Sequence, residues 1–135
     1  MKNKLKITER GFAGHFCASR SCLFHRNTLV EYGDKRIIVS TVGNYQPRSE
    51  YNPADKRLYE IGVNRFYETM VFRAKKEGVY WEADVSDEVE FQSEWALDEL
   101  EEESDMKADL MHDKVVKEIA EFIIKPKSKV ADTTK

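Results

Sequence analysis

Two histidines and two cysteines lie within eleven residues of one another in the first part of the sequence. These four potential ligands are His15, Cys17, Cys22 and His25, in the pattern H-x-C-x4-C-x2-H. Thiolate and imidazole groups are the ligands that zinc prefers, and four of them complete a tetrahedral site. The spacing differs from that of zinc fingers and ribbons, so an alternative also stands: both cysteines are buried small residues or free thiols.

The same side chains could supply a nucleophile and its base. A thiol of Cys17 or Cys22 would be activated by a neighbouring imidazole, and the candidates for that base are His15, His25 and His112. No third residue at a recognisable spacing would orient such a pair. The sequence also contains no P-loop, no dinucleotide-binding glycine pattern and no hydrolase or zinc-protease motif. It therefore favours a protein that is not an enzyme.

Two carboxylates stand two residues apart on a predicted strand. Glu82 and Asp84 would share one face of that strand, with Glu68 near them on the preceding strand. Carboxylates in this arrangement can bind Mg²⁺ or divide the roles of acid and base. The alternative is a solvated strand face on which these acids are partnered by Arg73.

Arginines alternate with aromatic residues through the first two thirds of the chain. They are Arg10, Arg20, Arg26, Arg36 and Arg73, interleaved with Phe12, Phe16, Phe24 and Tyr80. Basic and aromatic side chains on a sheet are what a binding surface for single-stranded nucleic acid needs, and a pocket for a small anionic molecule would use the same residues. The residues at the centre of a site of either kind would be Arg26, Glu68, Tyr80, Glu82 and Asp84.

The charges are distributed unevenly along the chain. The net charge is −3, but residues 1–86 carry 15 basic and 10 acidic side chains, whereas residues 87–113 carry 12 acidic side chains and one basic. The acids are densest at Glu99, Glu101, Glu102 and Glu103. One interpretation is a solvated helix face whose acids stabilise helix N-termini. The other is a surface that complements a host protein with a basic surface.

The elements that would position these side chains begin with a predicted hairpin. The segments Phe24–Tyr32 and Lys35–Val42 flank Gly33 and Asp34, which suit a two-residue turn. The second of these strands is almost wholly β-branched or apolar, so we expect it to be central and covered on both faces. The polar residues Gly43–Asp55, which include two prolines, predict a long loop.

A second hairpin is predicted from Arg65–Ala74 and Val79–Ser86, with Gly78 in its turn. If Phe72 pairs with Trp81, one face carries the side chains expected in the core, which are Met70, Phe72, Trp81, Ala83 and Val85. The other, polar face then carries Tyr67, Thr69, Arg73, Tyr80, Glu82 and Asp84. Glu68 falls on the core face, an anomaly that a slip of one residue would remove.

The last third of the chain predicts helices. Ser93 can cap a first helix, which would contain Trp95, Leu97 and Leu100. Ser104 or Asp105 can cap a second, longer helix that ends before Pro126. The apolar positions that keep near-helical spacing in this second helix are Met106, Leu110, Val115, Ile119, Phe122 and Ile123. The tail 127–135 is predicted to be disordered.

Strands first and helices last predict an α+β fold, a curved antiparallel sheet of two or more hairpins packed by one or two C-terminal helices. The sequence has 135 residues, 41% of them hydrophobic and 35% charged, which is enough for a single domain over residues 1–126 without a metal or a disulfide. The near balance of charges excludes a protein that is basic throughout. There is no apolar stretch of membrane-spanning length and no signal peptide, so we expect a soluble, cytoplasmic protein.

Five stretches of the sequence resemble a family of small proteins carried by bacteriophages, prophages and other mobile elements of bacteria. They are RGFAGHFC (10–17), CLFHRNTL (22–29), VSTVG (39–43), RFYETM (65–70) and YWEADVS (80–86). The resemblance covers about residues 8–100 and implies no catalytic residue. It implies a small accessory protein that binds or inhibits a host protein, a class that includes antagonists of restriction and CRISPR systems. We therefore expect a binding protein of the bacterial cytoplasm with no cofactor, unless zinc is bound as considered above.

Overall fold

The computed structural model of the chain describes residues 3–10, 22–45, 66–91, 96–97 and 103–125. The elements within these ranges are β1 (Leu5–Arg10), β2 (Cys22–Tyr32), β3 (Lys35–Tyr45), β4 (Tyr67–Glu77), β5 (Tyr80–Glu88), β6 (Ala96–Leu97) and α1 (Ser104–Ile124). The predicted tail 127–135 and residues 46–55 of the predicted loop lie outside the described residues. The predicted loop is wrong at residues 43–45, which continue strand β3 because they pair with β2 on one side and, at Gly43, with β4 on the other.

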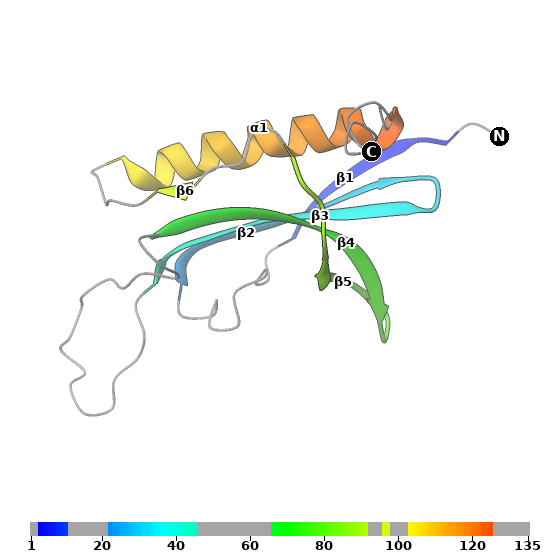
Figure 1. Cartoon of the computed structure of the whole chain (residues 1–135), viewed down its shortest axis with the longest axis horizontal. Helices are drawn as coiled ribbons and strands as arrows, with labels where there is room; N and C mark the ends of the chain where they lie inside the picture. The colour runs from blue at the N-terminus through cyan, green and yellow to red at the C-terminus, as the bar shows by residue number, and fades with distance from the viewer. Residues whose placement is uncertain (1–2, 11–21, 46–65, 92–95, 98–102, 126–135) are drawn as a thin grey trace.

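The main sheet is an antiparallel meander in the order β1-β2-β3-β4-β5, and the short β6 pairs with the start of β4. Helix α1 lies along one face of this sheet, and β4 curves away from the helix toward β5 (Figure 1). The predicted α+β fold, a curved antiparallel sheet packed by one C-terminal helix, is therefore confirmed.

The first predicted hairpin is confirmed, with β2 and β3 joined at Gly33 and Asp34. Gly33 has a φ of 66°, which glycine adopts without the steric cost that other residues incur. Strand β3 is central in the sheet, and its residues 37–43 are all buried. Because successive side chains point to opposite faces, both faces of β3 are covered, as its unbroken apolar sequence predicted.

The core lies between the sheet and α1. Its buried side chains are Val30, Ile37, Val39, Val71, Val89, Val115, Ile119, Ala120 and Ile123. The strand residues of this set occupy matched positions in the register, since Ile37 pairs with Val30, and Val39 pairs with Val71. They form one apolar face, and burying it against the helix supplies the main favourable term in folding.

The register predicted for the second hairpin is wrong. Its turn is shorter than predicted, at Gly78 and Val79, so Trp81 pairs with Lys76 and not with Phe72. A bulge between Phe72 and Ala74 then places Glu88 opposite Phe72. The side chain of Val85, expected in the core, is 64% exposed as a result.

The face of β4 that was predicted to be polar is the one that meets the helix. The side chains of Tyr67, Thr69 and Val71 are almost fully buried on that face. Phe72 is buried on the opposite face, beside Met70, so the strand is covered on both sides at its centre. The prediction was wrong because a hydroxyl group on Tyr or Thr does not prevent burial when a hydrogen-bond partner lies opposite.

The helix predicted from Ser93 is also wrong, at least where the structure describes it. Ala96 and Leu97 form strand β6, opposite Glu68 and Tyr67 of β4. Local helix propensity is a weak signal there, and backbone pairing with the start of β4 prevails over it. Residues 92–95 and 98–102 of that segment lie outside the described residues.

The longer helix is confirmed, but its buried face differs from the apolar positions that predicted it. Met106 is 54% exposed and Leu110 is 64% exposed. The buried positions are Ser104, Ala108, His112, Val115, Ile119, Ala120 and Ile123. The residue before the first turn is Glu103, and neither Ser104 nor Asp105 is the N-cap. The helix ends at Ile124, two residues before Pro126, which could not continue it.

Arg10 links the two outer strands of the meander. Its guanidinium donates to the side-chain oxygen of Asn27 at 2.8 and 3.0 Å and to the backbone carbonyl of Trp81 at 2.7 Å. Arg10 lies on β1 and Trp81 on β5, at opposite ends of the strand order. The sheet is therefore curved enough for one side chain to span it, on the face away from α1.

Candidate functional site

A buried histidine joins the helix to the sheet. His112 of α1 is fully buried, and both of its ring nitrogens contact threonine hydroxyls. Nε2 lies 2.8 Å from Oγ1 of Thr28, and Nδ1 lies 2.7 Å from Oγ1 of Thr41. The Thr41 hydroxyl in turn lies 2.8 Å from that of Thr69. Since neither nitrogen is left for a thiol, His112 is not available as the base of the predicted cysteine–histidine pair.

The direction of these hydrogen bonds follows from the carboxylate of Glu9, which accepts a hydrogen bond from Thr28 at one end of the chain of bonds. Thr28 donates its hydroxyl proton to Glu9, so its oxygen must accept from His112 Nε2–H. The neutral imidazole then accepts at Nδ1 from Thr41, whose oxygen accepts from Thr69. Burial lowers the pKa of His112 to about 4, and the nearby Arg26 acts in the same direction. The chain of bonds is therefore complete with the imidazole neutral.

Beside this histidine, Arg26 is surrounded by carboxylates. Its guanidinium lies 2.9 Å from Glu9, 3.1 Å from Asp109 and 2.9 Å from Asp113. Glu9 comes from β1 and the two aspartates come from α1, so Arg26 connects three elements. The hydrogen bond to Glu9 is the largest of the effects that raise the pKa of Arg26.

The same contacts determine the ionisation of Glu9. Burial alone would raise the pKa of this carboxyl, but hydrogen bonds from Arg26 and Thr28 outweigh burial and leave its pKa below the usual value. Arg26 is thus neutralised within the molecule. The sequence predicts Arg26 as part of a site for an anion or a nucleic acid. In the structure its guanidinium is instead paired with three acids of the same chain.

The other predicted members of that sheet site lie elsewhere. Arg26 is on the helix side of the sheet, whereas Glu68 is half-buried on the opposite side, opposite Val42. Tyr80 is 61% exposed at the start of β5, and Glu82 pairs across the strands with Lys75. Asp84 accepts hydrogen bonds from the hydroxyl and backbone N–H of Ser86, and these lower its pKa. The five residues do not form one site.

The described arginines of the predicted nucleic-acid surface are also divided between the two faces. Arg26 and Arg73 lie on the helix side, where Arg73 is 3.6 Å from Asp87. Arg36 lies on the other side with Arg10, 2.9 Å from Glu31 and with its guanidinium 4.3 Å from the ring centre of Trp81. Each has an intramolecular partner, and together they make no continuous basic stripe. Arg20, Phe12 and Phe16 lie outside the described residues.

The metal hypothesis falls largely outside the described residues. His15 and Cys17 are not described, and of Cys22 only its place at the start of β2 is known. His25 is an exposed residue of β2, opposite Val42. Among the described side chains, no group of three or more His, Cys, Asp or Glu is close enough to hold a metal ion.

The acidic segment serves partly as internal counter-charge. Asp109 and Asp113 pair with Arg26, and Asp105 accepts a hydrogen bond from the hydroxyl of the buried Tyr67. Glu103 is exposed at the helix start. Glu99, Glu101 and Glu102 lie outside the described residues. The two interpretations of this segment were a solvated helix face and a surface for a basic partner. The structure adds a third role, because Asp105, Asp109 and Asp113 hold α1 against the sheet.

The outer side of the first half of α1 carries two exposed apolar side chains. Met106 and Leu110 are one helical turn apart and therefore adjacent on the helix surface. Glu103 lies three residues before Met106 and Asp113 three residues after Leu110, and the exposed Lys107 and Lys114 lie about one turn on either side of Leu110. This combined surface, Glu103, Met106, Leu110 and Asp113, is called the outer patch below.

Sequence reasoning missed the polar centre of the core and the outer patch for the same reason. Stepping back from Val115 at intervals of three or four residues leads to His112, Ala108 and Ser104, not to Leu110. The gap of five residues between Leu110 and Val115 was the signal that the two belong to different faces. The buried positions in this half of the helix carry small or polar residues, so a search for apolar residues at helical spacing does not find them.

Two further findings concern the helix and the comparison of the chain with known proteins. Within the described residues, α1 is not apolar enough over its length to cross a membrane. No family model, no curated protein and no solved structure matches this chain.

Proposed function

We propose that this chain is a non-enzymatic binding protein that engages a host protein with a basic surface through the outer patch of α1. The observation that carries the proposal is the exposure of Met106 and Leu110 side by side, next to the acids Glu103 and Asp113. Apolar side chains supply affinity when they are buried in a partner, and acids around them select a partner of positive charge. Helix faces with anchors spaced in this way commonly dock into partner grooves.

The position of the patch supports this use. Asp109 and Asp113 attach the first half of α1 to Arg26, so the patch is presented on a helix that is held in place. Their side chains remain 55% and 65% exposed, so both carboxylates can also act on a partner in contact with the helix. A preorganised surface costs less conformational entropy on binding than a flexible one.

The resemblance to small proteins of phages and mobile elements supplies the biological context of the proposal. In that context the partner is a bacterial host protein, and a nucleic-acid-binding protein of a defence system has the required basic surface. The outcome proposed is inhibition by occupation of that surface. The resemblance is an analogy, and the outer patch supports binding of a basic protein independently of it.

The test is affinity capture from a lysate of the bacterium whose genome carries the gene. Three forms of the protein are compared: the natural chain, a variant with Met106→Ser and Leu110→Ser, and a variant with Glu99, Glu101, Glu102 and Glu103 changed to Lys. Both variants should lose a partner that the natural chain retains. Burying half-exposed Met and Leu side chains is worth about 1 kcal/mol each, which corresponds to a roughly 30-fold loss for the pair.

The matched control is Val79→Ser. Val79 is 77% exposed in the turn between β4 and β5, so its replacement removes a similar apolar side chain far from α1 in the topology. This control should capture the same partner as the natural chain, and capture should weaken as the salt concentration rises. Identical captured proteins for all four forms, or no partner for the natural chain, would contradict the proposal.

A further inference from the structure

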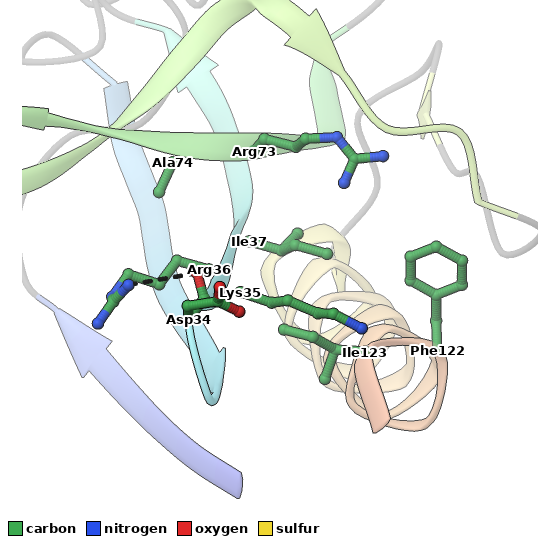
Figure 2. Close-up of a pocket in the computed structure, with 8 residues that line it drawn as sticks. All are labelled: Asp34, Lys35, Arg36, Ile37, Arg73, Ala74, Phe122 and Ile123. Atoms are coloured by element: carbon green, nitrogen blue, oxygen red, sulfur yellow. Dashed lines mark hydrogen bonds between the residues drawn. The ribbon is translucent and has the colours of Figure 1, made fainter. Parts of the chain in front are cut away.

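A pocket of about 460 Å³ opens between the sheet and the C-terminal end of α1. Its lining comes from the β2–β3 turn, the start of β3, strand β4 and the last turns of the helix (Figure 2). The lining residues are Asp34, Lys35, Arg36, Ile37, Arg73, Ala74, Phe122 and Ile123. The volume falls within the range of sites for small molecules, which is about 300–1,000 Å³.

The pocket has an apolar wall and two cationic side chains, Lys35 and Arg73. Ile37 and Ile123 are core residues that are 2% and 1% exposed and lie beneath the pocket, and the half-buried ring of Phe122 beside them supplies its accessible apolar surface. In Figure 2 the ammonium of Lys35 and the guanidinium of Arg73 extend from different strands toward the side on which Phe122 stands. Arg36 contributes mainly its backbone, because its side chain pairs with Glu31 and contacts Trp81 on the other face.

The two cations differ in how far they are already neutralised. Within the described part of the chain, Lys35 has no ion-pair partner. Arg73 has one partner, Asp87, at 3.6 Å, with both side chains about half exposed. Such an exposed and long ion pair contributes little, so an incoming anion can compete for Arg73. The Asp34 carboxylate lies at the turn end of the group, away from Phe122 (Figure 2).

We infer that this pocket binds an amphipathic carboxylate, with its anionic head between Lys35 and Arg73 and its apolar body against the ring of Phe122, over Ile37 and Ile123. The guanidinium can bind a carboxylate through two parallel hydrogen bonds, and the ammonium adds a flexible third donor. The apolar wall then excludes water from one side of the ligand, as in most small-molecule sites. This site is separate from the outer patch, which lies on the opposite half and the outer side of α1.

Three ligands with the same apolar body and different heads test the inference. Octanoate, 1-octanol and octylammonium are titrated into the full chain, and binding is followed by calorimetry and by amide shifts in two-dimensional NMR. Octanoate should bind at least tenfold more tightly than octanol, and octylammonium should bind most weakly. Shifts should concentrate at residues 34–37, 73–74 and 122–123, which line the pocket.

Four variants separate the two cations from general effects. Arg73→Gln and Lys35→Gln should each weaken octanoate at least about fivefold, which is less than the full value of a charged hydrogen bond because the site is open. Asp87→Asn should strengthen octanoate, since it removes the competing carboxylate. Lys75→Gln, on the same strand but paired with Glu77 outside the pocket, should leave the affinity unchanged.

Several results would overturn the inference. Equal affinity for the three head groups would show that Lys35 and Arg73 do not bind the carboxylate. Unchanged octanoate affinity in Arg73→Gln and Lys35→Gln, even with a lower melting temperature, would show that both cations act only on the helix end, where positive charge is favourable. Absence of octanoate binding at millimolar concentration would overturn the site itself and leave the outer patch untouched.

Discussion

At the scale of single residues, His112 shows how a titratable group can be structural. It is fully buried, and its two nitrogens have opposite roles, since Nε2 donates to Thr28 and Nδ1 accepts from Thr41. A second proton on the imidazole would make Nδ1 a donor and place a cation near Arg26. The neutral form is therefore the one that the folded protein holds, and the histidine connects strands β2 and β3 to the helix.

This arrangement predicts a loss of stability at mildly acidic pH. The folded-state pKa of about 4 lies below the ordinary value of 6.5, so the unfolded chain binds more protons between these two values. The contribution of the neutral His112 to the free energy of unfolding is fully present above about pH 7 and is lost as the pH is lowered toward 4. Between pH 7.5 and pH 5 the loss due to His112 should be about 2 kcal/mol, measured by urea unfolding.

The variant His112→Gln provides the control for that measurement. It has no titrating imidazole, so its stability should change by about 2 kcal/mol less over the same pH interval, whatever its absolute stability. An NMR titration of the natural chain adds a direct check, since the His112 ring signal should not shift above pH 5. A ring that titrates near 6.5 in the folded protein would show the assignment to be wrong.

At the scale of elements, Arg26 is the main polar attachment of α1 to the sheet. Its three carboxylate partners belong to β1 and α1, and Arg26 itself belongs to β2. Its side chain is 23% exposed, and the acids are 49–65% exposed, so each pair is worth about 0.2–1 kcal/mol. The attachment matters because three such pairs converge on one rigid guanidinium.

Arg26→Gln should therefore loosen the first half of α1 more than it lowers global stability. Amide hydrogen exchange of residues 105–116 should accelerate about tenfold, which corresponds to a local cost of about 1.4 kcal/mol. The matched control is Arg36→Gln, whose arginine is 26% exposed and pairs with Glu31 of the neighbouring strand, with no partner on the helix. Equal acceleration in the two variants would refute the attachment role.

At the scale of the whole molecule, the curvature of the sheet brings its first and last long strands within reach of one side chain. Arg10 of β1 contacts Asn27 of β2 and the carbonyl of Trp81 on β5. Asn27 is 2% exposed and would otherwise lack this donor, and burial lowers the pKa of Arg10 itself. These contacts connect strands that share no ladder of backbone hydrogen bonds.

Replacing Arg10 by Lys should lower the free energy of unfolding by about 1–2 kcal/mol, because one ammonium cannot reproduce the hydrogen bonds to two acceptors. Hydrogen exchange should accelerate in β5 and remain slow in the central β3. Lys6→Gln is the control on the same strand and the same face, where Lys6 is exposed and lies opposite Glu31. Uniform acceleration across the sheet would indicate that Arg10 does not bridge the two strands specifically.

How far the sequence predicts this protein depends on whether a feature is local. The β2–β3 hairpin, the covered β3 strand and the long helix follow from turn residues and periodicity within a few positions, and all three are confirmed. Gly43 illustrates the limit. The sequence predicts a loop that starts at this residue, yet Gly43 lies in β3 beneath the ring of Tyr67, which would clash with an added Cβ. The requirement for glycine at this position becomes visible only once β3 is paired with β4, which places Gly43 opposite Tyr67.

Local patterns are enough to predict the strands of the first hairpin, the helix and the α+β class, because backbone geometry converts spacing along the chain directly into faces and turns. Three features become visible only in the folded chain: the face of β4 that meets the helix, the pairing of Asp109 with an arginine 83 positions earlier, and the outward direction of Met106 and Leu110. These three features depend on contacts between residues that are far apart in the sequence. Burial of apolar surface and pairing of charges decide those contacts, and a local sequence pattern does not say which distant residue will be the partner.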